Sequence, residues 1–362
     1  MNGKILHLVG SQTSDYYYGV SRVMYAPGCI AALPELDHLV LLARLDGTWS
    51  LCTSLDKADH AERLSLPEAL GQLGREKIAC VQPHMFDYKG MVSTRSIAEL
   101  LDIPMVGSPG EVMALTTNKW QSRAVVASHG VSVPKAQLLR PGDKVEMRVP
   151  LIIKPCREDN SMGITLVQTE SDIESALIEG FKYDDQLLCE QFIPLGRELR
   201  IGVVDGEDDE LEFLPVIEYF LGHKKQPIRT SADKISSPDG TANGMDFVGG
   251  DRQCPADIDE VLRRKLVDMA RRSHEALGCR HYSLYDVRVD PEGNPFFIEA
   301  SPYCSFSPKS VIVTMSRGDP KYNDTDIFYR LARKAIREHQ PIGSSNQAMG
   351  MRSRGVLKVV RA

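Results

Sequence analysis

The sequence lacks the features that would indicate a metal cluster, a membrane protein or a nucleic-acid-binding protein. Its eight cysteines are scattered without any CxxC pair, so neither a zinc cluster nor a disulfide framework is indicated. No apolar run approaches a membrane span, and the first residues lack the long apolar region of a signal peptide. The formal net charge of -6 leaves no bulk basic surface for nucleic acid. Reduced thiols fit a cytoplasmic protein best, and we therefore expect a cytoplasmic location.

The pattern of apolar residues indicates an α/β protein with more than one core. A strand at 4–9 runs into a polar turn and a helix, and strands at 38–43 and 78–82 alternate with helical segments such as 93–101, which is typical of a parallel sheet. A chain of 362 residues is longer than a single core usually grows. We predict an N-terminal domain, a central subdomain, a C-terminal subdomain and a flexible tail, at residues 1–105, 106–185, 186–340 and 341–362.

The segment HYSLYDVRVDPEGNPFFIEAS contains two strand-like runs separated by a Pro-Glu-Gly-Asn turn, which predicts a β-hairpin. If Glu292 and Gly293 form the turn centre, Asp286 lies opposite Glu299 because both are equally far from the turn. The residues alternating with them are apolar and should pack on the core. The face expected toward a cleft consists of Leu284, Asp286, Arg288, Phe297, Glu299 and Ser301.

Two carboxylates roughly 5 Å apart repel each other unless a cation or a proton intervenes. A bridging Mg²⁺ would remove this repulsion. In the alternative interpretation the strands are offset, both acids are solvated, and Arg288 neutralises one of them. Acids on paired strands are common, so the hairpin alone is weak evidence for a metal.

Three upstream segments, GSPGEVMALTTNKWQSR, VPLIIKPCREDNSMGITLV and LLCEQFIPLGREL, precede this hairpin. Together they make the chain resemble the ATP-grasp superfamily, specifically enzymes such as D-alanine:D-alanine ligase, over roughly residues 4–320. The resemblance implies an ATP-grasp fold, in which an N-terminal parallel-sheet domain is followed by two α+β subdomains that clasp ATP. It also implies ATP and Mg²⁺ as cofactors, with Mn²⁺ able to replace Mg²⁺, and a homodimer.

The same resemblance assigns nucleotide and metal contacts to individual residues. It implies that Lys119 and Lys154 reach the phosphates, and that a mobile loop after Lys154 closes over ATP. The alternative for Lys119 is a surface lysine, and the alternative for Lys154 is a solvated lysine at a strand end. For Glu190 and Glu198, the alternative is a pair of solvated acids on a half-exposed strand. The implied ATP contacts also include Asn160 and Ser161 in the loop, Glu190, Phe192 and Ile193 at the adenine, and Glu198 at the ribose, while Asp286, Glu299 and Ser301 are the implied metal ligands.

Further segments resemble the substrate loops of the family. Lys234, in RTSADKI, corresponds to a group that approaches the γ-phosphate and the substrate. Asp15 and Ser21 fall in the loop that receives an amino-acid substrate, and His84 falls where a histidine lines the same pocket. A surface loop for Asp15 and a core hydrogen bond for His84 are the alternatives.

Three positions depart from the dipeptide-forming relatives. Those relatives carry an arginine two residues before the metal aspartate, where this chain has Leu284. The glycine of their oxyanion hole falls at Ser305, and their asparagine metal ligand falls at Ser301, which can still coordinate more weakly. These groups serve attack on an acyl phosphate, so their replacement indicates a different electrophile.

The hairpin region, together with HLVGSQTSDYYYGVSRVMYA and QPIRTSADK, most resembles the ligases that complete mycosporine-like amino acids, which are ultraviolet sunscreens. This resemblance implies that the amine of serine, threonine or glycine is joined to phosphate-activated mycosporine-glycine. A dipeptide ligase and a nucleotide-binding protein without catalysis remain as alternatives. The expected catalytic residues are Lys154, Lys234 and Arg288, and the expected substrate contacts are Asp15, Ser21, His84, Ser305, Lys309 and Ser310. For Arg288, an ion pair with Asp286 or Glu299 is the alternative.

Overall fold

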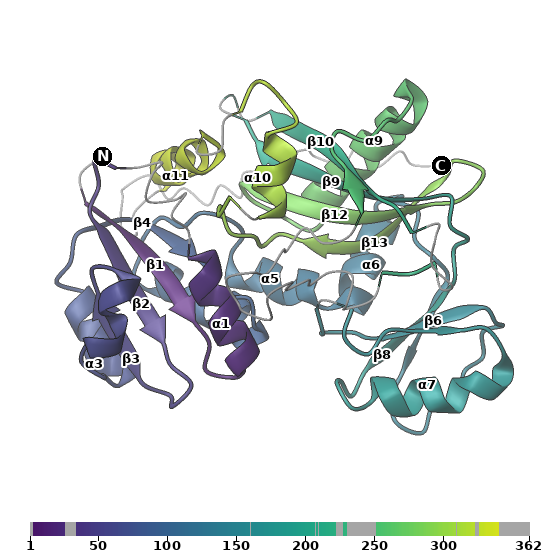
Figure 1. The fold of residues 1–362 in the computed structure, drawn as a ribbon, viewed down its shortest axis with the longest axis horizontal. Coiled ribbons are helices and arrows are strands. Elements are labelled where there is room, and N and C mark those ends of the chain that lie inside the picture. Colours follow the sequence, from purple (N-terminus) through teal and green to yellow (C-terminus); the bar gives the residue numbers. More distant parts are fainter. Residues whose placement is uncertain are drawn as a thin grey trace, which may run out of the picture.

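Three β-sheets follow one another along the chain and confirm the predicted α/β class (Figure 1). The computed structural model describes residues 3–25, 34–159, 161–206, 208, 210–221, 227–229, 251–308, 310–322 and 326–339. Within these ranges, no helix combines the length and the apolar character that a membrane crossing requires. The predicted flexible tail lies outside the described residues.

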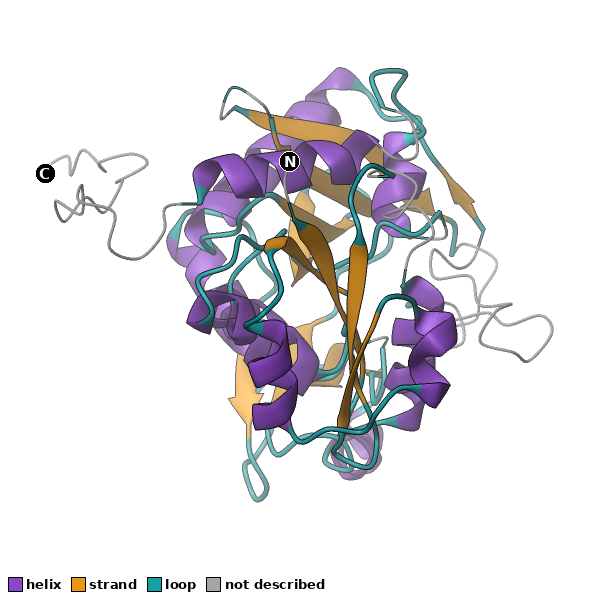
Figure 2. Cartoon of the chain, turned by 90° about the vertical axis from the view of Figure 1, so that its left-hand side faces the viewer, coloured by secondary structure: helices purple, strands orange, loops and turns teal. Residues whose placement is uncertain are grey.

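The first sheet has the order β3-β2-β1-β4, and β1 pairs in parallel with both β2 and β4. Figure 2 shows these strands in the middle of the N-terminal unit with helices on either side. The helical segment expected at 93–101 is split into a π-helical turn, Gly90–Thr94, and α4. The elements are β1 Lys4–Gly10, α1 Asp15–Met24, β2 His38–Ala43, β3 Trp49–Cys52, a 3₁₀ turn Leu55–His60, α3 Leu66–Leu73, β4 Ile78–Pro83 and α4 Ser96–Leu100.

Gly10 fixes the junction between β1 and α1. Its φ of +97° favours glycine, and an added Cβ would overlap the carbonyl oxygen of Ala43 on the neighbouring strand. The Gly10 amide donates a hydrogen bond of 2.7 Å to the hydroxyl of Ser21, which in turn donates to the carbonyl oxygen of His84 at 2.6 Å. Ser21 therefore ties α1 to the ends of β1 and β4.

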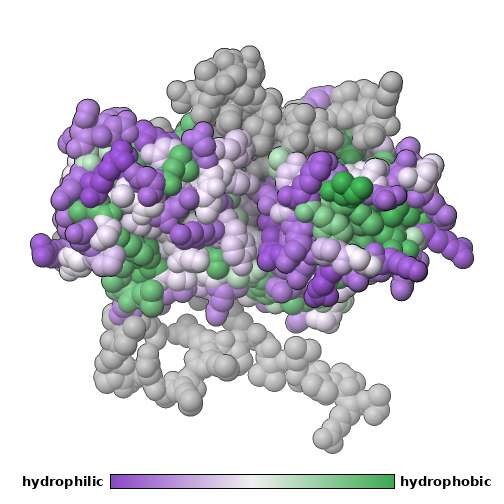
Figure 3. All heavy atoms as spheres, turned by 90° about the horizontal axis from the view of Figure 1, so that it is seen from below, coloured by the Kyte–Doolittle hydropathy of each residue, from purple (hydrophilic) through white to green (hydrophobic). Residues whose placement is uncertain are grey.

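The second sheet is antiparallel, with the order β5-β8-β6-β7, and α7 covers one of its faces. Alternation along β6 decides which residues face which side: Leu151 and Ile153 pack under α7, whereas Ile152 and Lys154 line the cleft on the other side. Figure 3 views this lobe and the N-terminal lobe from below, with some apolar surface on each. The elements are β5 Ala136–Leu139, β6 Leu151–Pro155, β7 Thr165–Val167, a 3₁₀ turn Glu170–Asp172, α7 Ile173–Gly180 and β8 Leu187–Gln191.

The third sheet has the order β11-β10-β9-β12-β13 and carries helices on both faces. Helix α9 packs on one face of this sheet, and Asp259 caps its start by accepting from the Leu262 amide. Helices α5 and α6, which lie within the predicted central subdomain, pack on this sheet. The elements are α5 Gly110–Thr117, α6 Lys119–Ser128, β9 Arg197–Asp205, β10 Leu211–Tyr219, β11 Arg252–Gln253, α9 Glu260–Ala276, β12 Tyr282–Val289, β13 Pro295–Ser301, α10 Val311–Ser316 and α11 Asp326–Glu338.

The hairpin of β12 and β13 confirms the predicted pairing of Asp286 with Glu299. The turn is tighter than expected, because the Asp290 amide donates to the Asn294 carbonyl oxygen and Val287 consequently pairs with Phe297. A β-bulge then adds one residue, Ile298, and restores the expected register at Glu299. The prediction that Phe297 faces the cleft is therefore wrong: Phe297 is buried in the core, and Ile298 lines the cleft instead.

The core of the first sheet contains a chain of histidines. His7 lies between His84 and His38, with a ring nitrogen 2.9 Å from each neighbour. Burial lowers the pKa of His84 to about 3 and holds the pKa of His7 well below its usual value. Both rings are therefore neutral in the folded protein at neutral pH.

We predict that this pair destabilises the fold as the pH falls. Below about pH 6.5 the unfolded chain binds protons that the folded histidines do not, so the free energy of unfolding falls by up to about 1.4 kcal/mol per pH unit for each histidine. Denaturant unfolding between roughly pH 7 and pH 5 should show this slope, and His7→Gln should flatten it. The exposed His129 supplies a control, His129→Gln. An unchanged slope in His7→Gln would contradict the assignment.

Candidate active site

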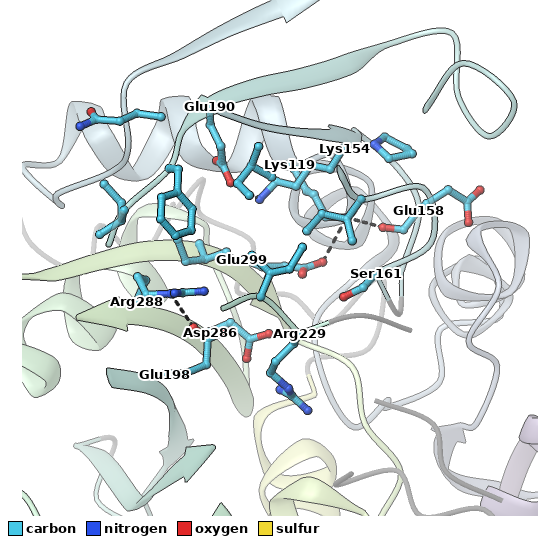
Figure 4. Close-up of a pocket in the computed structure, with 18 of the residues that line it drawn as sticks. Lys119, Lys154, Glu158, Ser161, Glu190, Glu198, Arg229, Asp286, Arg288 and Glu299 are labelled. Carbon is cyan, nitrogen blue, oxygen red and sulfur yellow. Dashed lines mark hydrogen bonds and ion pairs between the residues drawn. The ribbon is translucent and has the colours of Figure 1, made fainter. Parts of the chain in front are cut away.

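A cleft between the second and third sheets gathers most of the residues predicted to bind ATP. The cleft encloses about 760 Å³ of free space, part of which is open to solvent. Figure 4 shows Lys154 and Glu190 on one side, facing Asp286, Arg288 and Glu299 on the other. The charged and polar residues that line it are Lys119, Lys154, Glu158, Ser161, Glu190, Gln191, Glu198, Arg229, Asp286, Arg288 and Glu299.

Two lysines line the cleft, one on β6 of the second sheet and one at the start of α6. Lys154 on β6 pairs with Glu190 on β8 at 2.6 Å, and both side chains are only 6% exposed. Lys119, the first residue of α6, lies 3.2 Å from Glu299 and donates to the carbonyl oxygen of Glu158. Burial disfavours the charged form of Lys119, but the carboxylate of Glu299 outweighs it and raises the pKa. Lys119 is therefore charged and links the two walls of the cleft.

The opposite wall is a row of charged side chains across three strands. Arg200 on β9 pairs in register with Asp286 on β12, which pairs with Glu299 on β13. The Nε and Nη2 atoms of Arg200 donate to the two carboxylate oxygens of Asp286, the second at 2.7 Å. Each of the two adjacent carboxylates thus has its own cation, Arg200 for Asp286 and Lys119 for Glu299.

Arg288 pairs with neither of these carboxylates. Its Nε lies 2.7 Å from Glu198, and its two terminal nitrogens donate to the carbonyl oxygen of Pro227 at 3.0 Å. Its guanidinium carbon also lies 5.9 Å from the centre of the Phe192 ring. Arg288 therefore holds the residue predicted to bind the ribose, at the end of the cleft where the apolar side chains gather.

Apolar side chains gather at one end of the cleft, where a flat ring could pack against them. Ile152 and Ile228 are buried there and Phe192 packs against them. The carboxylate of the neighbouring Glu190 lies beside this apolar surface. A polar group in such a position can accept a hydrogen bond from a heterocycle and fix its orientation. The apolar lining residues of the cleft are Ile152, Pro155, Met162, Ile164, Phe192, Ile193, Ile228 and Ile298.

The carboxylates fit a magnesium ion that is shared with a phosphate ligand. Asp286 and Glu299 are hard oxygen donors on one face of the sheet, and Ser301 follows two residues later on β13. Among the described residues, no group of three or more His, Cys, Asp or Glu side chains is placed to hold a metal. Mg²⁺ is commonly bound by one or two carboxylates together with substrate phosphates and water. Two carboxylates are therefore a suitable protein contribution.

A second pocket lies on the other side of Asp286. Arg200 and Arg229 supply positive charge there, and Leu284 supplies an aliphatic wall. The predicted substrate residues Ser305 and Ser310 line it, as does the predicted metal ligand Ser301. The remaining lining residues are Tyr17, Val20, Met24, Phe86, Asp159, Tyr303, Cys304 and Val311.

Three residues predicted to contact the substrate lie outside the two pockets. Asp15 is exposed in the first turn of α1. Ser21 and His84 are fully buried and make the scaffold contacts described above. None of the three lines either of the two pockets, and their roles in substrate binding stay predictions. The predicted residues Asn160, Lys234 and Lys309 lie outside the described residues.

The sequence interpretation missed two arginines. Arg200 lies two residues after Glu198 and lines the second pocket, and Arg229 lines both pockets from a segment without periodicity. The guanidinium of Arg229 stacks 3.6 Å from the centre of the Tyr219 ring. The parity of β9 relative to Glu198 would have placed Arg200 on the cleft face.

Comparison with known proteins identifies the family. The sequence profile of the family described as D-ala D-ala ligase C-terminus matches residues 132–319, just over half of the chain. The chain belongs to this family. The D-alanine–D-alanine ligase of Citrifermentans bemidjiense is 29% identical over 229 residues, which cover 62% of this chain and 68% of that protein. The protein y4sG of Sinorhizobium fredii is 28% identical over 298 residues, which cover 81% of this chain and 82% of the relative.

Solved structures agree on the fold. The D-alanine-D-alanine ligase from Coxiella burnetii superposes with a TM-score of 0.71 at 19% identity, covering 94% of this chain and 95% of that one. The VanG D-Ala:D-Ser ligase from Enterococcus faecalis gives 0.70 at 21% identity, covering 92% and 100%. The ATP-grasp fold is thereby confirmed, and family membership makes the protein an ATP-dependent ligase.

We predict that nucleotide binding by this ligase needs the buried charge of Lys154. Lys154→Met leaves Glu190 buried and unpaired, which should cost several kcal/mol of stability. The double variant Lys154→Met/Glu190→Gln should recover most of the melting temperature, yet bind ATP at least about tenfold more weakly in calorimetry because a charged phosphate contact is lost. Wild-type ATP affinity in the double variant would remove Lys154 from the nucleotide site.

Proposed function

We propose that the ligase joins the amine of an amino acid to phosphate-activated mycosporine-glycine. The observation that carries this proposal is the second pocket, where Leu284 presents an aliphatic side chain beside the carboxylate row and Ser305 lies close by. Neither residue supplies a cation for the oxyanion that forms when an amine attacks an acyl phosphate. A vinylogous ketone needs no such oxyanion, because its oxygen is lost with the phosphate.

The proposed reaction uses the two pockets in sequence. The ketone oxygen of the acceptor takes the γ-phosphoryl group of ATP, and ADP leaves. The amine nitrogen then forms a bond to the ring carbon, the carbon–oxygen bond breaks with its electron pair going to phosphate, and the nitrogen loses protons to leave an imine. Lys119 and Lys154 would neutralise the phosphates during this transfer. Serine, threonine or glycine is the proposed amine donor, and the homodimer and the cytoplasmic location stay predictions.

Asp286 and Glu299, with Ser301, are the residues proposed to hold Mg²⁺. When bound, the ion would screen the phosphate charge during phosphoryl transfer. The protein's own part is to hold the two carboxylates side by side through the register of β12 and β13. Lys119 contacts Glu299 and would bring a positive charge to the same place.

A second candidate function is a dipeptide ligase of the D-alanine:D-alanine type that acts through an acyl phosphate. The names of several relatives favour it, including the ligase from Citrifermentans bemidjiense. Those relatives match this chain at about 30% identity or less. The two candidates differ in the acceptor, so the acceptor decides between them.

The acceptor is tested by incubating the protein with ATP, Mg²⁺ and either mycosporine-glycine with pooled amino acids or D-alanine alone. We expect phosphate release and a shift of ultraviolet absorption to longer wavelength with the first mixture, because the new imine extends the conjugated system. Omitting the amino acids is the control and should remove the shift. Phosphate release with D-alanine alone would establish the dipeptide ligase instead.

We predict that Asp286→Asn and Glu299→Gln each lower turnover by about 100-fold or more. Each substitution removes a carboxylate that is proposed to hold Mg²⁺ beside the transferring phosphate. The Mg²⁺ concentration for half-maximal ATP-analogue binding should rise in parallel in calorimetry. Asp290→Asn, in the exposed turn of the same hairpin, is the control and should leave both quantities unchanged. Near-normal turnover in both site variants would contradict the metal assignment.

A further inference from the structure

Arg200 forms part of the wall between the two pockets. It lines the second pocket, whereas its partner Asp286 lines the ATP cleft. The two side chains are joined by two hydrogen bonds across β9 and β12. The two pockets are thus adjacent at this ion pair, and Arg229 lines both of them.

The guanidinium retains a donor for a ligand. Nε and Nη2 bind Asp286, and among the described residues no hydrogen bond or ion pair of Nη1 is found. The side chain is only 12% exposed, so this donor faces a pocket rather than bulk water. The guanidinium of Arg200 stays protonated at neutral pH, as arginine side chains do in proteins. A charged donor is therefore available at the boundary of the two pockets.

The next row of the sheet offers nothing equivalent. Gly202, Leu284 and Ser301 pair across the same three strands, two residues further along. An added Cβ on Gly202 would lie 3.0 Å from a methyl group of Leu284. This row is therefore neutral and closely packed. Of the two rows, the one with Arg200 carries the positive charge that lines the second pocket.

We propose that Arg200 contacts the phosphoryl group as it passes between the two pockets and stabilises the negative charge on the oxygen atoms of the transferring group. The inference rests on the proposed function for the identity of the acceptor. It follows from the geometry that the arginine binds through one edge of its fork to Asp286 and keeps Nη1 for the ligand. Because phosphoryl transfer is accelerated mainly by positioned positive charge, such a contact acts on turnover more than on ATP binding.

The alternative is that Arg200 only holds Asp286 in place. The two roles predict different kinetics. If Arg200 only positions Asp286, its loss weakens the binding of nucleotide and Mg²⁺. If Arg200 contacts the transferring phosphoryl group, its loss lowers turnover. Arg200→Met and Arg200→Lys separate them. For each variant, kcat is measured with mycosporine-glycine and amino acids, and affinity for a non-hydrolysable ATP analogue with Mg²⁺ is measured by calorimetry.

We expect Arg200→Met to lower kcat by about 100-fold while the affinity for the ATP analogue changes by less than about threefold. Arg200→Lys keeps the charge without the fork and should retain part of the rate, and it serves as the folded variant if Arg200→Met is unstable. Arg197→Met is the matched control, since Arg197 lies on the same strand, pairs with Glu218 and lines neither pocket.

Moving the charge to the neighbouring row is a second test. Leu284→Arg in the otherwise wild-type protein should not raise kcat. In the Arg200→Met background, the same substitution should raise kcat about tenfold, because the new guanidinium enters the pocket from β12. An unchanged kcat in Arg200→Met, or a loss of analogue affinity as large as the loss of kcat, would overturn the proposal. If the wild type releases ADP only with D-alanine, the acceptor assignment fails, and the same variants measured with D-alanine still test Arg200.

Discussion

The side-by-side carboxylates of Asp286 and Glu299 impose the charge arrangement on which the rest of the site depends. Their strands hold them in register, so their mutual repulsion must be offset by cations. Arg200 from β9 and Lys119 from α6 supply these cations, and they come from different parts of the chain. The pairing of β9 with β12 and the packing of α6 on the third sheet are thus also electrostatic requirements of the site.

The cleft between the second and third sheets keeps most of its charges paired within the protein. Lys154 pairs with Glu190 and Arg288 with Glu198, in addition to the pairs around Asp286 and Glu299. In the proposed function, the triphosphate and the divalent ion would exchange partners with these pairs.

The sequence predicted the local parts of the site well. The hairpin turn and strand alternation were enough to pair Asp286 with Glu299, although a tighter turn and a compensating bulge moved Phe297 into the core. Arg200 and Arg229 were missed because their importance depends on a neighbouring strand and on a segment without periodic pattern. The scaffold contacts of Ser21 were not predicted, since they depend on how α1 docks on β1 and β4. For His84, a core hydrogen bond was the alternative interpretation, and the structure shows the ring beside His7.

The central claim is that a phosphoryl group passes from ATP to the acceptor's oxygen across the wall formed by Asp286 and Arg200. It is tested most directly by labelling the ketone oxygen of mycosporine-glycine with ¹⁸O and following the label by phosphorus NMR. The account predicts one ¹⁸O atom in each inorganic phosphate released during imine formation, because the carbon–oxygen bond breaks after phosphorylation. Unlabelled phosphate released at the same rate as the imine forms would contradict it.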